Sequence, residues 1–190
     1  AMMDKPQSFI AFEILYWCGL RLGELLALTP GDFDFASKRL SITKSYQRMH
    51  GEDVITAPKT PKSVRTIAMP EFLVGEAIDF MRCIPDLRNE DRLIPVTKSF
   101  LHHEMDRGAK AAGGKRIRIH DLRHSHVSLL IELGYSALAI ADRLGHESTE
   151  VTMRYAHLFP NKQEDMARDL DVQRGNAESP FDMAKPMKQA

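Results

Sequence analysis

The chain has 190 residues, of which 43% are hydrophobic, and it carries 26 basic and 26 acidic side chains but only two cysteines. This length suffices for one domain with a substantial core, or for two small domains. The apolar runs are short and interrupted by charge, and the first residues have no apolar core, which argues against a membrane span and a signal peptide. Two cysteines are too few for a disulfide framework, so we expect free thiols in a soluble cytoplasmic protein.

Positive charge is concentrated in two blocks although the net charge is zero. Residues 38–70 contain seven basic and two acidic side chains, and residues 107–123 contain six basic and one acidic side chain. Such blocks either form a solvated face or bind a polyanion, and composition does not distinguish the two.

The first half of the chain is predicted to contain two helices and a small sheet. Apolar residues recur at helical spacing in SFIAFEILYWCGLRLGELLAL, which indicates two helices that break near Gly19 and end before Pro30. The stretches RLSITKS, DVITA and VRTIAM are β-branched, roughly alternating and bounded by turn residues. They predict one small antiparallel sheet.

Helical spacing returns after Pro70. We expect helices over residues 71–81, 98–111, 120–133 and 136–144, the last closed by Gly145 in the left-handed conformation. A short helix capped by Ser148 or Thr149 is expected to run towards His157 and to carry Tyr155. The expected fold class is therefore mainly α with a small antiparallel β-sheet (α+β).

The C-terminal region is predicted to be one exposed helix followed by a tail. The stretch NKQEDMARDLDV, residues 161–172, has the composition of an exposed helix, and the polar, proline-interrupted residues 173–190 are typical of a flexible tail. We therefore expect one domain over residues 1–172 and a tail over residues 173–190.

Two pairs of polar residues have helical spacing. Arg21 and Glu24 are three positions apart on one helix face, where an ordinary ion pair also explains them. His120 and Arg123 have the same spacing, and an imidazole beside a guanidinium fork suits a phosphate group. Two polar residues on a wet helix face are the alternative explanation.

The third feature is a tyrosine nine residues after a histidine, Tyr155 after His146. Tyrosine is a poor nucleophile at its free pKa of about 10, so its covalent use requires a nearby base and cations. A core histidine and an amphipathic aromatic residue would give the same pattern.

These features form a series along the chain: Arg21, the pair His120 and Arg123, His146 and Tyr155. Taken in this order, they resemble the signature of the tyrosine recombinases, the phage-integrase family. The resemblance covers residues 8–160 and rests on the motifs GLRLGELLAL, HDLRHS and LGHESTEVTMRYAH. The family has a lysine in a hairpin turn of its small sheet, and Lys59 in APKTPKSVRTI matches that position, with Lys62 as the fallback. The resemblance implies the tyrosine recombinase catalytic-domain fold and the site residues Arg21, Lys59, His120, Arg123, His146 and Tyr155.

The resemblance also implies the role of each site residue. Arg21 and Arg123 would bind the non-bridging oxygens of a scissile DNA phosphate. Tyr155 would attack phosphorus and form a 3′-phosphotyrosyl enzyme, while Lys59 would protonate the departing 5′-oxygen. His120 would help to take the tyrosine proton. His146 would donate to a phosphate oxygen.

The same resemblance implies a site-specific recombinase, bacterial or phage-encoded, that needs no cofactor, metal or ATP. Its partners would be double-stranded DNA and other copies of the chain, forming a tetramer on two duplexes. The helix after Tyr155 would dock onto a neighbouring protomer. Family members have a DNA-clamping domain before the region matched here, so residues 1–172 would be the catalytic domain. The expected DNA contacts are Lys62, Arg65, Arg116 and Arg118.

Three alternatives remain open from the sequence. A type IB topoisomerase would use the same residues but would reseal the strand that it cut. A DNA-binding module without catalysis would need only the basic blocks. A metal site could use His120, His124 and His126, with His102 and His103 nearby, although no acidic third ligand has the expected spacing.

Overall fold

The computed structural model describes residues 4–58, 60–153, 155, 158 and 163–174. The chain separates into two compact units, residues 1–158 and residues 159–190. Every described residue outside the last helix belongs to the first unit. The boundary expected at residue 172 stays a prediction.

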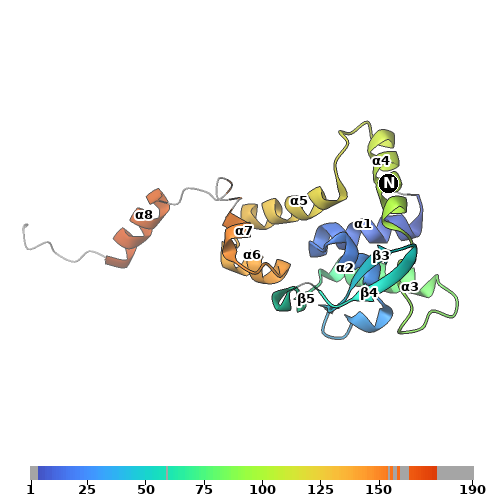
Figure 1. Ribbon diagram of the computed structural model, residues 1–190. Helices are drawn as coiled ribbons and strands as arrows, with labels where there is room; N and C mark the ends of the chain where they lie inside the picture. The colour runs from blue at the N-terminus through green and yellow to red at the C-terminus, as the bar shows by residue number, and fades with distance from the viewer. Residues whose placement is uncertain (1–3, 59, 154, 156–157, 159–162, 175–190) are drawn as a thin grey trace, which may run out of the picture. The chain divides into compact units, whose positions relative to one another are not determined.

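The helices of the first unit follow the predicted pattern closely (Figure 1). They are α1 (Pro6–Cys18), α2 (Leu22–Ala27), α3 (Glu71–Arg82), α4 (Lys98–Ala111), α5 (Ile119–Glu132), α6 (Ala137–Leu144) and α7 (Thr149–Met153), with 3₁₀ turns η1 (Pro30–Asp32) and η2 (Pro61–Ser63). Gly19 ends α1 and Gly145 ends α6, both with left-handed φ. The break near Gly19 and the left-handed conformation of Gly145 were predicted. The short helix α7 stops before Tyr155, which lies in the turn that follows, so the prediction that this helix carries Tyr155 was wrong.

The second unit contains α8 (Gln163–Arg174). Within the part of the helix whose side chains are described, all residues are exposed, as expected for residues 161–172. No described helix in either unit is long and apolar enough to cross a membrane.

The strands pair antiparallel, but they form two sheets rather than the single sheet predicted. Strands β1 (Phe33–Asp34), β2 (Arg39–Ile42) and β5 (Arg65–Ala68) form one sheet in the order β1-β2-β5. Strands β3 (Ser45–Met49) and β4 (Glu52–Thr56) form a separate hairpin. The alternating pattern predicts strands but not their partners, so the split after Ile42 could not be read from it.

The core surrounds α1, which packs against α2, α3 and α5 (Figure 1). Its fully buried side chains include Ile10, Ile14 and Leu15, and each such aliphatic side chain contributes roughly 1.5–3 kcal/mol by leaving water. Leu40 from β2 and Tyr46 from β3 are buried in the same core. The core therefore fixes the ends of α2 and α5 relative to the β-strands.

Gly145 is the point at which the end of α6 meets the turn η2. It has φ 65°, and a Cβ built on it would lie 2.7 Å from the Lys62 carbonyl oxygen and 3.1 Å from the Ser63 Cα. Only glycine allows this approach, because the clashing atoms belong to the backbone. His146 follows directly, so the contact also sets the position of that histidine.

We predict that Gly145→Ala destabilises the chain more than Gly134→Ala. Both glycines have positive φ, which costs an L-residue roughly 1–2 kcal/mol. A Cβ at Gly134 would meet nothing within 4 Å, whereas one at Gly145 would meet backbone and should cost about 1–3 kcal/mol more. Urea denaturation of the two variants measures the difference. Equal losses of unfolding free energy would contradict the close approach of α6 and η2.

Candidate active site

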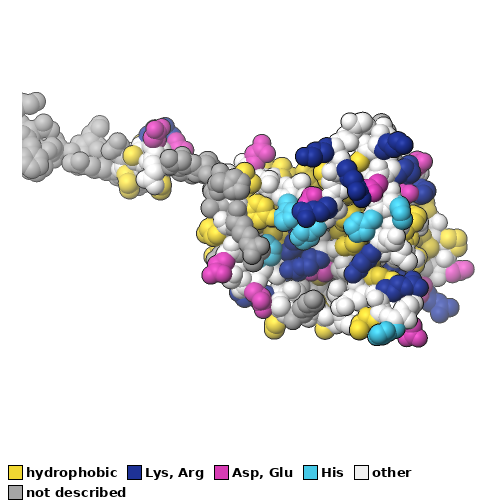
Figure 2. Space-filling model, turned by 45° about the horizontal axis from the view of Figure 1, so that its top comes forward, with side chains coloured by type: hydrophobic (Ala, Val, Ile, Leu, Met, Phe, Trp, Pro, Cys, Tyr) yellow, Lys and Arg dark blue, Asp and Glu magenta, His cyan; other side chains and the backbone are white. Residues whose placement is uncertain are grey.

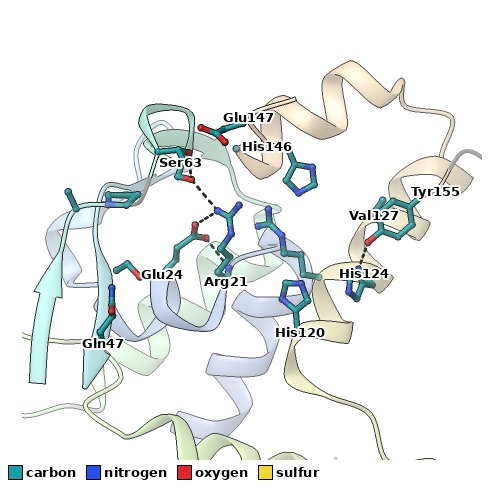
Figure 3. A pocket seen from close by; sticks show the side chains of 16 residues that line it. Arg21, Glu24, Gln47, Ser63, His120, His124, Val127, His146, Glu147 and Tyr155 are labelled. Carbon is teal, nitrogen blue, oxygen red and sulfur yellow. Dashed lines mark hydrogen bonds and ion pairs between the residues drawn. The ribbon is translucent and has the colours of Figure 1, made fainter. Parts of the chain in front are cut away.

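A pocket of about 450 Å³ collects five of the six predicted site residues (Figure 3). Its lining residues come from the start of α2, the hairpin β3–β4, the segment before η2, α5, and the segment from Gly145 to Tyr155. The five are Arg21, His120, Arg123, His146 and Tyr155. Lys59 lies outside the described residues, and its neighbours Pro58 and Thr60 line the same pocket.

Glu24 lines the pocket and binds two arginines. Its carboxylate accepts from Arg21 Nη1 at 2.8 Å and from the Arg21 backbone amide at 2.9 Å. Arg65 donates to the same carboxylate through Nη2 at 3.0 Å and Nη1 at 3.2 Å. The Glu24 side chain is 3% exposed and that of Arg21 is 40% exposed. The buried carboxylate thus holds Arg21 while part of its guanidinium remains open to the pocket.

The charge of Glu24 is maintained by these arginines. Burial alone would raise the pKa of the Glu24 carboxyl, but the hydrogen bonds and positive charges of Arg65 and Arg21 outweigh burial and lower it. The carboxylate is therefore ionised at neutral pH and balances part of the positive charge in the pocket.

Arg123 forms the buried wall of the pocket. Its guanidinium donates to the Gly19 carbonyl at 2.5 Å and to the Leu144 carbonyl at 2.8 Å. Burial, followed by the charge of Arg21, lowers the pKa of Arg123 to about 9, which still leaves it protonated at neutral pH. The two bonds use two of the five guanidinium donors. Arg123 is thus a cation fixed in position by the ends of α1 and α6.

Both predicted site histidines are held in the neutral form. Burial and then the charges of Arg123 and Arg21 lower the pKa of His146 to about 4. Its Nδ1 is 3.0 Å from the hydroxyl of Thr152, which is buried on α7. Burial, then His124 and Arg123, also lowers the pKa of His120. Neutral imidazoles can accept a proton as well as donate one.

Tyr155 bonds to His124, a histidine for which the sequence suggested only a metal-binding role. The phenol oxygen is hydrogen-bonded to Nδ1 of His124, and the two ring centroids are 5.8 Å apart (Figure 3). The Tyr155 amide donates to the Thr152 carbonyl at 3.0 Å, which ties the turn to α7. The spacing of His124 from His120, one helical turn, was the signal that could have revealed it.

The predicted DNA contacts divide into exposed and buried residues. Lys62 is exposed and donates to the Glu147 carbonyl. The side chain of Arg116 is 79% exposed and pairs with Asp106, and that of Arg118 is 78% exposed and pairs with Asp121. Basic and histidine side chains gather on one face of the first unit (Figure 2).

The prediction of Arg65 as a surface DNA contact was wrong. Its side chain is only 6% exposed, and it bonds to Glu24 and to the carbonyls of Ser63 and Arg143. Proximity to basic residues in the sequence gave no indication that this guanidinium points inwards.

The histidines of the alternative metal site point to different surroundings. His124 and His120 lie against each other in the pocket, with ring centroids 4.7 Å apart. His126 is buried and accepts from Arg143 Nε at 3.2 Å. Within the part of the chain that the structure describes, no three His, Cys, Asp or Glu side chains form a group that could hold a metal ion.

We predict that Glu24→Gln destabilises the fold strongly. The amide would leave Arg65 without its buried counter-charge, and breaking a buried pair in this way costs roughly 3–5 kcal/mol. The matched control is Glu71→Gln, since Glu71 is 77% exposed and pairs with Lys38 at the surface. Urea denaturation should show a large loss for the first variant and little change for the second. Similar stability of both variants would contradict the anchoring role of Glu24.

Several known proteins are similar to this chain in sequence. Residues 3–162 match the family model described as the phage integrase family. The ICEBs1 integrase of Bacillus subtilis is 35% identical over 184 residues, covering 87% of this chain and 50% of that protein. The tyrosine recombinase XerC of Alcanivorax borkumensis is 31% identical over 152 residues, covering 77% and 46%. The chain spans about half the length of the curated relatives it matches.

Solved structures show the same fold. The Tn1549 transposon integrase, solved in complex with circular intermediate DNA, has a TM-score of 0.72 and 24% identity, with 87% of this chain and 59% of that chain covered. The catalytic domain of bacteriophage HP1 integrase has a TM-score of 0.58 and 21% identity, with 89% and 84% covered. Because the family model matches residues 3–162, which is most of the chain, the chain belongs to the phage integrase family.

Proposed function

We propose that the chain is the catalytic domain of a site-specific DNA recombinase, an integrase, that cleaves and rejoins DNA through a 3′-phosphotyrosyl intermediate. The observation that carries the proposal is the pocket in which a tyrosine, two arginines and the neutral histidines meet. Relatives named as integrases and recombinases support it. We assign the domain to residues 1–172 and the tail to residues 173–190.

The two arginines suit a phosphodiester. Arg21 is partly open to the pocket and Arg123 is fixed in its wall, so that both can bind the non-bridging oxygens of one phosphate. Negative charge on these oxygens is redistributed in the transition state, and cations already in position stabilise it without reorganisation. His146 donates a further hydrogen bond to the phosphate.

Cleavage exchanges one phosphate ester for another. The Tyr155 oxygen bonds to phosphorus, the bond from phosphorus to the 5′-oxygen breaks, and the tyrosine proton passes to an imidazole, a transfer in which His120 helps. Lys59 gives the departing 5′-oxygen its proton. The covalent link preserves the ester, so a 5′-hydroxyl can reverse the step without metal, ATP or cofactor.

Contacts outside the pocket position the duplex. The exposed cations Lys62, Arg116 and Arg118 lie close to pocket residues in the sequence. DNA phosphates can replace the carboxylates of Asp106 and Asp121, which pair with Arg116 and Arg118. Exposed ion pairs are weak, so this exchange costs little.

We further propose that copies of the chain assemble through α8, as a tetramer on two DNA duplexes. An apolar pocket in the first unit is lined by residues of α1, α5 and α6, including Trp17, Leu130 and Ile140. In the second unit, α8 exposes Met166 and Leu170, one helical turn apart. An apolar helix face of one copy fits such a pocket of another copy.

The relatives are bacterial and phage proteins, which supports a bacterial or phage-encoded protein that acts in the cytoplasm.

We predict that Tyr155→Phe abolishes covalent adducts with DNA. The assay uses duplexes with random sequence around a single nick, from which the released 5′-hydroxyl fragment diffuses away after cleavage. Wild-type protein should retain DNA through denaturing electrophoresis, and the variant should not, because only the nucleophilic oxygen has been removed. DNA affinity should be unchanged. Adducts that persist in the variant would place the nucleophile elsewhere.

We predict that sulfur at the bridging 5′-position rescues Lys59→Ala selectively. A thiolate leaves without a proton, so the variant should cleave this substrate at nearly the wild-type rate while cleaving ordinary DNA far more slowly. Arg21→Ala should not be rescued, because it loses charge stabilisation at other oxygens. Lys62→Ala is the matched control. Rescue of Lys62→Ala alone would transfer the role to that lysine.

We predict that Leu170→Asp prevents strand exchange between two duplexes but leaves the first cleavage intact. Burying an unpaired carboxylate in an apolar pocket is unfavourable, whereas single-strand cleavage needs only one copy. Asp169→Asn, a change at the preceding exposed residue, is the control. Normal exchange by Leu170→Asp would contradict docking through α8, and a wild-type chain that only reseals the strand it cut would favour the topoisomerase alternative.

A further inference from the structure

We propose that His124 is the residue that accepts the proton of Tyr155 during attack on phosphorus, and that it holds the phenol in place before DNA binds. This inference rests on the proposed function and deepens it, because it identifies the base at the nucleophile.

The position of His124 follows from the geometry of α5. His120 and His124 are separated by one helical turn and therefore share a face, and both line the pocket. Arg123 lies between them in sequence and points into the buried wall. This single helix thus presents a phosphate-binding cation and two imidazoles to the same space.

The hydrogen bond joins the atom that must lose a proton to an atom that can take it. The phenol oxygen of Tyr155 is bonded to Nδ1 of His124. A neutral imidazole accepts at Nδ1 when its own proton is on Nε2, so the phenol is the donor in this arrangement. Because a phenol is largely protonated at neutral pH, a base in hydrogen-bond contact is what its attack requires.

The other two imidazoles that line the pocket have different contacts. His146 has its Nδ1 at the Thr152 hydroxyl, and His120 packs edge-on against the ring of His124. Among these three described histidines, His124 is therefore the one in contact with the phenol, and His120 is its neighbour. His120 can help by orienting that ring.

The product of the transfer is also accommodated. When the Tyr155 oxygen bonds to phosphorus, its proton moves to Nδ1 and His124 becomes a cation. Asp121 lies one turn earlier on α5 and interacts electrostatically with His124. Hydrogen bonds from the side chain and the backbone amide of Arg118 lower the pKa of Asp121 to about 2. An aspartate stays ionised at neutral pH even when the Arg118 side chain turns to a DNA phosphate, so Asp121 stabilises the imidazolium.

The contact can be tested without DNA. In protein labelled with ¹⁵N-histidine, Tyr155→Phe removes the hydrogen bond and should shift the Nδ1 resonance of His124 more than that of His120. A shift confined to His120 would mean that the phenol is bonded there in solution, and it would overturn the inference.

The proton transfer is tested by changing the acidity of the phenol. His124→Asn places an amide oxygen near the position of Nδ1, so the variant can accept a hydrogen bond but cannot take up a proton. It should slow adduct formation by about 10²–10⁴-fold, the usual contribution of a general base. Replacing Tyr155 with 3-fluorotyrosine and 3,5-difluorotyrosine, whose phenols are progressively more acidic, should steadily reduce this deficit. His120→Asn is the matched control and should show no such recovery.

The outcomes separate the two proposals. If the wild-type protein forms an adduct and His124→Asn forms it equally fast, the role of His124 as proton acceptor is contradicted, but the proposed function is not. The same conclusion follows if fluorination of the phenol restores the rate of adduct formation in His120→Asn but not in His124→Asn. A deficit in His124→Asn that is unaffected by phenol acidity assigns His124 a purely structural role and also overturns the inference. Absence of an adduct in the wild-type protein contradicts the proposed function, and with it the proton transfer.

Discussion

The ion cluster in which Arg21 and Arg65 meet the buried carboxylate of Glu24 is the interaction on which the rest of the pocket depends. It connects the start of α2 to β5. It is also linked to α6, because Arg65 donates a hydrogen bond to the Arg143 carbonyl at 2.9 Å. Removing the charges of Glu24 and Arg65 from water is costly, and only close pairing with several hydrogen bonds offsets that cost. The arrangement is therefore sensitive to the exact position of each partner. This sensitivity makes the cluster suitable for fixing a functional arginine.

Burial, together with the fixed cations of the pocket, sets the electrostatic state of the histidines. Arg21 and Arg123 are cations held in place before any substrate binds, and their charges contribute to the lowered pKa of His146 and His120. The pocket thus combines permanent positive charge with neutral imidazoles. Fixed charge is suited to a phosphodiester, and neutral imidazoles are suited to proton transfer. Both follow from the same small set of buried contacts.

Much of this arrangement could be predicted from the sequence, because the relevant signals are local. Helical periodicity located α1 and α3–α6 to within a few residues, and Gly145 marked the end of α6. The signals failed where the outcome depends on distant partners. Arg65 looks like any exposed cation in a basic block, and only its buried contact with Glu24 shows otherwise. The pairing of strands into two sheets depends in the same way on tertiary packing.

The site shows the same division between local and distant information. The resemblance of Arg21, His120, Arg123, His146 and Tyr155 to the family signature implied a common site, and the structure brings these residues together. The bond from Tyr155 to His124 was missed because Tyr155 lies in a turn after α7, and the direction of its side chain depends on how that turn packs.

Covalent attachment of one phenol in this pocket to the 3′-end of a DNA strand is the central claim. Tandem mass spectrometry of nuclease-trimmed, protease-digested adducts tests it most directly, because it identifies both the modified side chain and the polarity of the attached nucleotide. We expect a nucleoside 3′-phosphate esterified to Tyr155. A nucleotide attached through its 5′-phosphate, or attached to any other side chain, would contradict the claim.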